Sequence, residues 1–125
     1  MKLTYLKTKH YTLLWNLSAI EKDIAERRYA FKIKRMPVVN ILGIYYLGKV
    51  DWTTVNIGVH PIVAELAMDK YFVMSGGEQI EKAHFLGMRD IYCYYLTPSQ
   101  QMRYLINHDE KDYRRAVAEY WKDEV

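Results

Sequence analysis

The sequence predicts an α+β fold, in which a small antiparallel sheet of three to five strands has helices packed mainly on one face. Apolar residues recur with period two in some stretches and with period 3.6 in others, so both strands and helices are expected. The 125-residue chain is 50% hydrophobic and 26% charged, which is typical of a folded domain with its own core. We therefore expect a single globular domain over residues 1–125. A mainly α fold is the alternative, because periodicity does not separate a short buried strand from a buried helical segment.

The N-terminal part of the chain is expected to lead into a capped helix. Residues 1–15 are rich in Thr, Tyr and Leu and are compatible with either an edge strand or a helix. A helix is predicted to follow, because Ser18 and Glu21 have the spacing of a capping box. Asp23 and Arg27 stand four positions apart, in the order that favours an ion pair on a helix surface.

The next segment changes period. Phe31 and Ile33 alternate with Lys32 and Lys34, which is the pattern of a half-buried strand. Because successive side chains of a strand point to opposite faces, we expect Phe31 and Ile33 to face the core. The two lysines would then share one outward face.

The middle of the chain is read as a hairpin followed by a helix. Residues 38–47 are nearly all apolar and predict a central strand covered on both faces. The Gly-Lys pair at 48–49 suits a two-residue turn, and residues 50–59 are rich enough in β-branched residues to be the partner strand. Pro61 suits the first turn of a helix, which we expect to continue through residues 62–74.

The C-terminal half alternates short elements. A helix over 78–86, a strand over 91–96 and a short helix with Thr97 as its cap and Pro98 at its first position are predicted. The last helix, over 109–122, has the clearest amphipathic pattern in the chain. Its predicted core positions are Tyr113, Ala116, Val117, Tyr120 and Trp121.

Patterns typical of enzyme chemistry are weak, so the sequence favours a non-enzymatic role, and we assign no catalytic residue, metal ligand or cofactor. Glu81 and His84 form a single Glu-x-x-His step, and the acids at 107–112 are explained by helix capping. Two glycines precede the helix at 78, but its glutamates would repel a phosphate. Cys93 lies in an apolar strand and is read as a core thiol.

Compartment and membrane contact are inferred from composition. The single cysteine excludes an internal disulfide and fits the reducing cytoplasm. No apolar run reaches the ~18 residues of a membrane span, and the first residues show no signal-peptide core. We therefore expect a cytoplasmic protein with no membrane partner.

Charge is distributed unevenly along the chain. Residues 1–35 contain nine Lys/Arg and three Asp/Glu, a net charge of +6, whereas residues 36–125 contain nine and twelve, a net charge of −3. Residues 27–35 hold five of the cations and no acid. An uneven field of this kind acts on partners and their orientation more than on the fold. The candidate binding residues are Arg27, Arg28, Tyr29, Lys32, Lys34 and Arg35.

This basic segment suggests a macromolecular-interaction module. The favoured function is a small intracellular regulator or inhibitor that binds an acidic protein or ribonucleoprotein surface. The alternative is direct binding of DNA or RNA by the same segment, with Tyr29 as a stacking ring. A small enzyme or ligand binder is third, and a homo-oligomer is compatible with the sequence. A merely solvated face, in which lysines on an outer strand prevent aggregation, explains the same charges.

Overall fold

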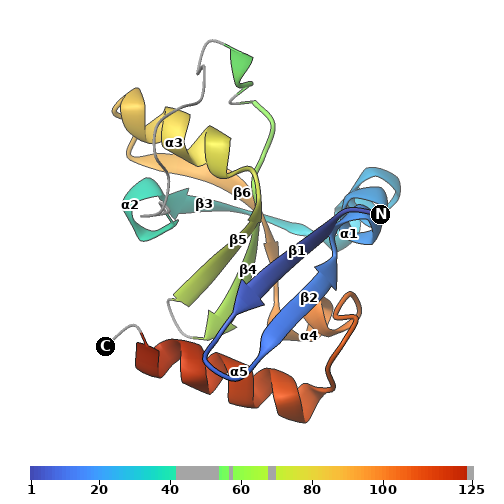
Figure 1. The fold of residues 1–125 in the computed structure, drawn as a ribbon. Coiled ribbons are helices and arrows are strands. Elements are labelled where there is room, and N and C mark those ends of the chain that lie inside the picture. The colour runs from blue at the N-terminus through green and yellow to red at the C-terminus, as the bar shows by residue number, and fades with distance from the viewer. Residues whose placement is uncertain (42–53, 57, 68–69, 124–125) are drawn as a thin grey trace.

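The structure, a computed structural model, describes residues 1–41, 54–56, 58–67 and 70–123, and has an α+β fold (Figure 1). The described residues form a two-stranded sheet and a four-stranded sheet, with helices packed against the larger one. The strands are β1 (Leu3–Lys7), β2 (Thr12–Asn16), β3 (Lys32–Pro37), β4 (Ile62–Ala67), β5 (Lys70–Ser75) and β6 (Asp90–Leu96). The helices are α1 (Leu17–Glu26), the 3₁₀ helix η1 (Arg28–Ala30), α2 (Val38–Ile41), α3 (Gly77–Phe85), α4 (Pro98–Met102) and α5 (Glu110–Asp123). The predicted fold class is confirmed.

The larger sheet has the strand order β3-β6-β4-β5, so β6 and β4 are central and β3 lies at one edge. β3 runs antiparallel to β6, and β4 runs antiparallel to β5. The two central strands are parallel to each other, with Ile62 opposite Tyr94. The last strand to be synthesised therefore lies between strands that precede it in the sequence.

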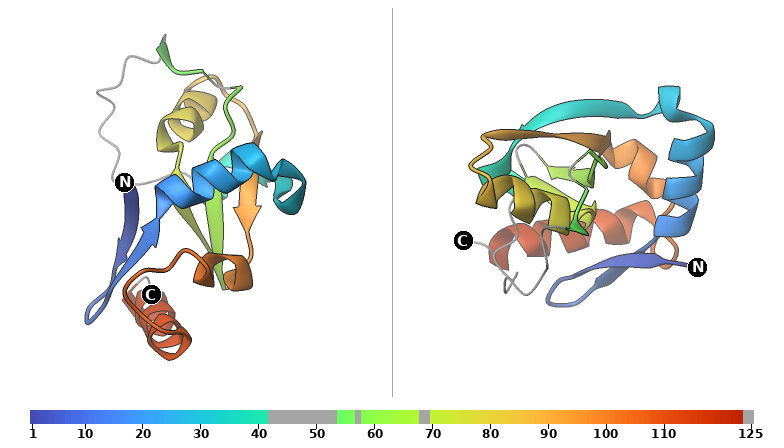
Figure 2. Two further views of the ribbon diagram at one scale, coloured as in Figure 1. Left: turned by 90° about the vertical axis from the view of Figure 1, so that its right-hand side faces the viewer. Right: turned by 90° about the horizontal axis from the view of Figure 1, so that it is seen from above.

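One face of this sheet carries the larger hydrophobic core. The β1–β2 hairpin, α1 and α5 cover it, and Figure 2 shows α1 crossing the strands while α5 runs along one end of them. Trp15 and Leu13 are fully buried there, and Trp15 stacks on Phe72 at 5.5 Å between ring centroids. The buried helical residues of this core are Leu17, Ile20, Ile24, Ala116, Tyr113 and Val117.

The other face carries a smaller core under α2 and α3. Ile80 and Ala83 of α3 pack on the sheet, together with Val38 and Ile41 of α2. Cys93 in β6 is fully buried among them, and burial raises the pKa of its thiol to about 12. The prediction that Cys93 is a core thiol is confirmed.

The predicted helix over 62–74 is wrong, because the described residues of this stretch form strands β4 and β5. The stretch is apolar on all sides because β4 is central and is buried on both faces: Val63 faces one core and Ala64 the other. A strand buried on both faces has no alternation, so its pattern resembles that of a buried helix.

The predicted hairpin over 38–59 is wrong where it is described. Val38–Ile41 form the short helix α2 rather than a strand, and residues 54–56 and 58–59 do not belong to a strand. Residues 42–53 and 57, with the predicted turn at 48–49, lie outside the described residues.

The N-terminal elements differ in detail from the prediction. Residues 1–15 contain β1 and most of β2, which pair as an antiparallel hairpin. Asn16 caps α1 by accepting a hydrogen bond from the Ala19 amide, because the helix begins two residues earlier than the Ser18 capping box implied. The predicted ion pair of Asp23 with Arg27 does not form: the Asp23 carboxylate accepts a hydrogen bond from Tyr104 Oη at 2.8 Å.

The later elements agree with the prediction. α3, β6 and α5 occupy the expected stretches, and α4 has Thr97 as its cap and Pro98 in its first turn, with Gln100 completing a capping box. Tyr113, Ala116 and Val117 are buried as expected, and Tyr120 packs against the same core. The side chain of Trp121 lies outside the described part of the structure.

Candidate functional site

The six predicted binding residues do not form one surface. Lys32 and Lys34 lie opposite Tyr95 and Cys93 in the β3–β6 ladder, so they share one face of the sheet, as predicted. Both are exposed, because the helices on that face do not extend over this end of β3. Lys34 Nζ lies 4.0 Å from the centroid of the Tyr95 ring, a cation–π contact that orients the lysine along the sheet.

Ile33 and Arg35, which alternate with the two lysines, point to the opposite face of the sheet. Ile33 lies opposite Tyr94, and Arg35 lies opposite Tyr92. Phe31 is buried as predicted, but the prediction that Ile33 faces the core is wrong, because its side chain is 38% exposed. The reason is that the core ends at Phe31, and the rest of this face of β3 is uncovered. Arg35 Nε lies 3.8 Å from Asp90 Oδ2, an exposed ion pair of little energetic weight.

The remaining three residues lie in the turn before β3. Arg27 ends α1, and Arg28 and Tyr29 belong to η1. All three are exposed, and the exposed fraction of Tyr29 is 90%. Burial and the hydrogen-bonded Asp23 carboxylate raise the pKa of the Tyr104 phenol to about 12. The positive charge of Arg27 lies close enough to Tyr104 to oppose this rise.

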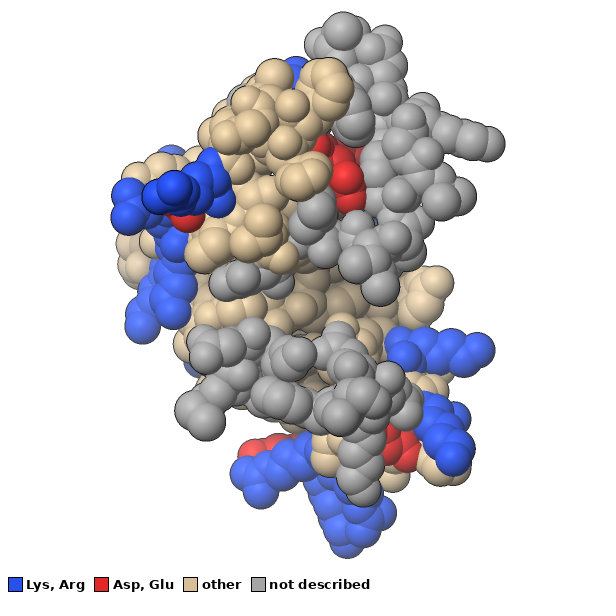
Figure 3. Space-filling model, turned by 90° about the vertical axis from the view of Figure 1, so that its left-hand side faces the viewer, with Lys and Arg blue, Asp and Glu red and all other residues tan. Residues whose placement is uncertain are grey.

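Basic side chains gather at the edge of the molecule on the β3 side. Figure 3 shows them at the margin of the face where α2 and β3 lie, around one acidic group, with a second basic group on the side of α5. Sequence reasoning missed the exposed neighbours of β3 on β6. Tyr92, which is 53% exposed, adds an aromatic ring beside Arg35. Residues 91–96 were predicted to form a strand, but the strand that pairs with them was not predicted.

A hollow of about 660 Å³ is lined in part by Tyr94 of β6. His60 meets the Tyr94 ring edge-on at 5.5 Å between centroids, and Glu21 is paired with Lys2 at 2.9 Å. Carboxylates and rings without a lining Lys or Arg, among the described residues, suit a cationic amine better than an anion. No sequence signal pointed to this hollow. Its lining residues are Glu21, Ile24, Val59, His60, Ile62, Ser75, Gly76, Gly77, Glu78, Gln79 and Tyr94.

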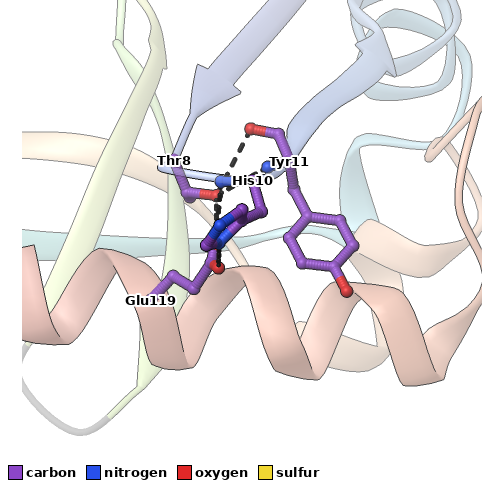
Figure 4. Close-up of polar contacts among 4 residues, drawn as sticks. All are labelled: Thr8, His10, Tyr11 and Glu119. Carbon is purple, nitrogen blue, oxygen red and sulfur yellow. Dashed lines mark hydrogen bonds and ion pairs between the residues drawn. The ribbon is translucent and has the colours of Figure 1, made fainter.

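A hydroxyl, an imidazole and a carboxylate meet between the β1–β2 hairpin and α5 (Figure 4). Glu119 Oε1 accepts hydrogen bonds from Thr8 Oγ1 at 2.8 Å and from the His10 amide at 2.9 Å. The His10 ring contacts the other carboxylate oxygen. The carboxylate therefore lies between the hydroxyl and the imidazole, so the imidazole cannot take the hydroxyl proton as it does in a catalytic triad. These residues tie the hairpin to α5.

The Glu119 contact should make stability depend on pH in the acid range. Burial raises the pKa of Glu119, but the His10 amide and ring and the Thr8 hydroxyl outweigh it and lower the pKa from 4.5 to about 2. The unfolded state then binds a proton first, so the contribution is complete above about pH 4.5 and is lost as the pH falls toward 2. We expect Glu119→Gln to lower the thermal midpoint at pH 6, with a difference from wild type that disappears near pH 2.

The matched control for this prediction is Glu110→Gln on the same helix. Glu110 Oε1 accepts a hydrogen bond from Arg114 Nη2 at 2.7 Å on an exposed surface. The Glu110→Gln substitution should therefore change the thermal midpoint little. Equal midpoint losses for the two variants, or a Glu119→Gln loss that persists at pH 2, would contradict the assignment.

No group of three or more His, Cys, Asp or Glu side chains placed to hold a metal ion occurs in the described part of the chain. Of the acids at 107–112, Asp109 caps the first turn of α5 and Asp112 pairs with His108 at 3.1 Å. Within the same residues, each helix is too short or too polar to cross a membrane.

Comparison with protein-family models, with curated proteins and with solved structures finds no match to this chain.

Proposed function

We propose that this protein is a non-enzymatic interaction module that binds an acidic protein or ribonucleoprotein surface through β3. A small regulator or inhibitor in the cytoplasm is the role that fits such a module. The observation that carries the proposal is the position of β3, an edge strand on which Lys32, Lys34 and Arg35 are all exposed. Charges at an exposed edge steer an acidic partner and set its orientation.

The surroundings of β3 add anchoring groups to this charge. Ile33 and Tyr92 are large side chains that remain substantially exposed on the face that also carries Arg35. Tyr and Arg are the residue types that contribute most to binding energy at protein interfaces. A solvated, protective edge explains the lysines, but it does not account for an exposed Ile33 and Tyr92 on the face that carries Arg35.

Charge reversal on β3 tests the proposal. We expect Lys32→Glu with Lys34→Glu to weaken binding of the partner at least about tenfold, a loss of about 1.4 kcal/mol. The measurement is a pull-down from a nuclease-treated lysate with quantitative mass spectrometry, followed by titration of the recovered protein at two salt concentrations. Both substitutions are on exposed side chains, so stability should change by only about 0.5 kcal/mol.

The control has the same spacing and the same change of net charge. Lys7→Glu with Lys9→Glu reverses two exposed lysines on the β1–β2 hairpin, away from β3. This variant should retain the partner. If both double variants lose it equally, or if wild type recovers nothing specific, binding through β3 is excluded.

Two other functions have supporting observations. Tyr29 and Tyr92 are exposed rings near cations, which favours the alternative of DNA or RNA binding by stacking. Binding of a labelled single-stranded oligonucleotide that weakens with salt and with Lys32→Glu and Lys34→Glu would select it. The hollow beside His60 and Tyr94 supports the third candidate, a small-ligand site.

A further inference from the structure

We infer that the partner's acidic segment binds as an added β-strand along the free edge of β3. This inference rests on the proposed function and specifies how the same residues act. In strand addition, backbone hydrogen bonds supply much of the affinity and alternate side chains supply specificity.

The outward-facing groups follow from the ladder. The Tyr94 amide donates to the carbonyl of Pro61, at the start of β4, at 2.8 Å, so the N–H and C=O of Tyr94 point toward β4. Because backbone groups alternate along a strand, those of Cys93 point the other way, toward β3. Cys93 lies opposite Lys34, so the N–H and C=O of Lys34 are used by β6.

Alternation then leaves Ile33 and Arg35 with their N–H and C=O on the outer edge. No described residue bonds to these groups. The row is short and has defined ends. The Phe31 amide is used by the Arg28 carbonyl at 3.1 Å, and Pro37 has no N–H. Two donors with their neighbouring carbonyls are thus available to an incoming strand.

The charge at this edge selects the occupant. A second copy of this chain pairing β3 with β3 would bring Lys32, Lys34 and Arg35 close to the same cations of the other copy, and like charges directly opposite are destabilising. An acidic strand places opposite charges there instead. The Asp90 carboxylate, 3.8 Å from Arg35 Nε, offsets one of these cations and leaves the charges of Lys32 and Lys34.

The side-chain pattern of the added strand also follows from the register. Residues of the added strand that lie opposite Lys32 and Lys34 share their face and should be acidic. The residue opposite Ile33 lies on the other face, against an exposed apolar side chain, and should be apolar. The expected ligand is therefore an extended segment in which Glu or Asp alternates with an apolar, β-branched residue.

Amide hydrogen exchange measured by NMR tests this mode of binding. The probe is a blocked peptide in which four Glu alternate with three Val. In the free protein, the Ile33 and Arg35 amides should exchange quickly. At saturating peptide their exchange should slow by about tenfold or more, because each gains a hydrogen bond. The Lys34 amide already bonds to β6 and should be unchanged.

A second peptide separates strand addition from attraction by charge. It has the same sequence with the three Val residues N-methylated, which keeps every charge and removes the N–H groups that would face Ile33. It should bind at least about tenfold more weakly, because the ladder hydrogen bonds are lost. If both peptides bind equally and Ile33 and Arg35 stay unprotected, strand addition is wrong, whereas the proposed function survives if Lys32→Glu with Lys34→Glu abolishes binding.

Two further outcomes overturn the inference. Failure of the unmodified peptide to bind wild type at millimolar concentration excludes an acidic strand as the occupant. If the Ile33 and Arg35 amides exchange more slowly as the protein concentration is raised in the absence of peptide, the edge is occupied by a second copy of the chain.

Discussion

Replacing Gly76 with Ala is expected to destabilise the protein by about 2–4 kcal/mol, through left-handed backbone strain and a backbone clash. Gly76 joins β5 to α3 with φ = 87°, a conformation that L side chains rarely adopt. A Cβ there would lie 2.7 Å from Cα and 2.9 Å from Cβ of Pro61, at the start of β4. Neither contact belongs to the end of a flexible side chain, so β4 or α3 must shift. Urea unfolding monitored by circular dichroism measures the loss.

Two other glycines separate the causes. Gly87 has φ = 74° but open space around its absent Cβ, so Gly87→Ala should cost about 1 kcal/mol for the backbone alone. Gly77 has neither constraint, and Gly77→Ala should be neutral or stabilising by up to about 1 kcal/mol. A loss for Gly76→Ala no larger than that for Gly87→Ala would show that the contact with Pro61 carries no energy.

Replacing Gln101 with Leu is expected to cost about 2–4 kcal/mol, because buried polar groups lose their partners. Gln101 in α4 is fully buried. Its Nε2 donates to the backbone carbonyls of Glu65, at 2.6 Å, and Leu96, at 3.3 Å, and its Oε1 accepts from Tyr113 Oη at 2.9 Å. One side chain thus joins β4, the end of β6 and α5. Leu has a similar volume and satisfies none of these groups.

A double-mutant cycle with Tyr113→Phe isolates the side-chain pair. Tyr113→Phe removes the hydroxyl and leaves one unpaired acceptor, at a cost of about 1 kcal/mol. The double variant should lose less than the sum of the two single losses, since the hydroxyl orphaned by Gln101→Leu is gone. A Gln101→Leu variant within about 0.5 kcal/mol of wild type would mean that the network does not hold the three elements together.

A one-sided environment makes the period of an element visible in the sequence, although β6, which contributes to both cores, is also predicted correctly. α5 packs one face on the core and leaves the other exposed, so its period of 3.6 was visible. β4 is buried on both faces, has no alternation and was read as a helix. The local sequence pattern indicates whether one or both faces of an element are buried, but it does not indicate the position of a strand in the sheet.

The candidate site shows the same limit. Alternation placed Lys32 and Lys34 on one face, and the structure agrees. It could not show that β3 would be an edge strand, because that depends on β6, β4 and β5, which follow it in the sequence. The exposure of Ile33 is a consequence of that position, whereas the separation of Arg35 from the two lysines follows from the alternation of side chains along the strand. The hollow beside His60 joins residues from five helices and strands and from two connections, and no local signal could have gathered them.

The central position of β6 has a consequence for folding during synthesis. Because β6 pairs with both β3 and β4, the sheet cannot close until the ribosome has released residues as late as Leu96. Until then β4 and β5 can form only a local hairpin, and both edges of β3 are open. Repulsion between the Lys32, Lys34 and Arg35 side chains of one nascent chain and those of another then opposes pairing of the two chains through β3. The same cations thus act on β3 before the sheet is complete.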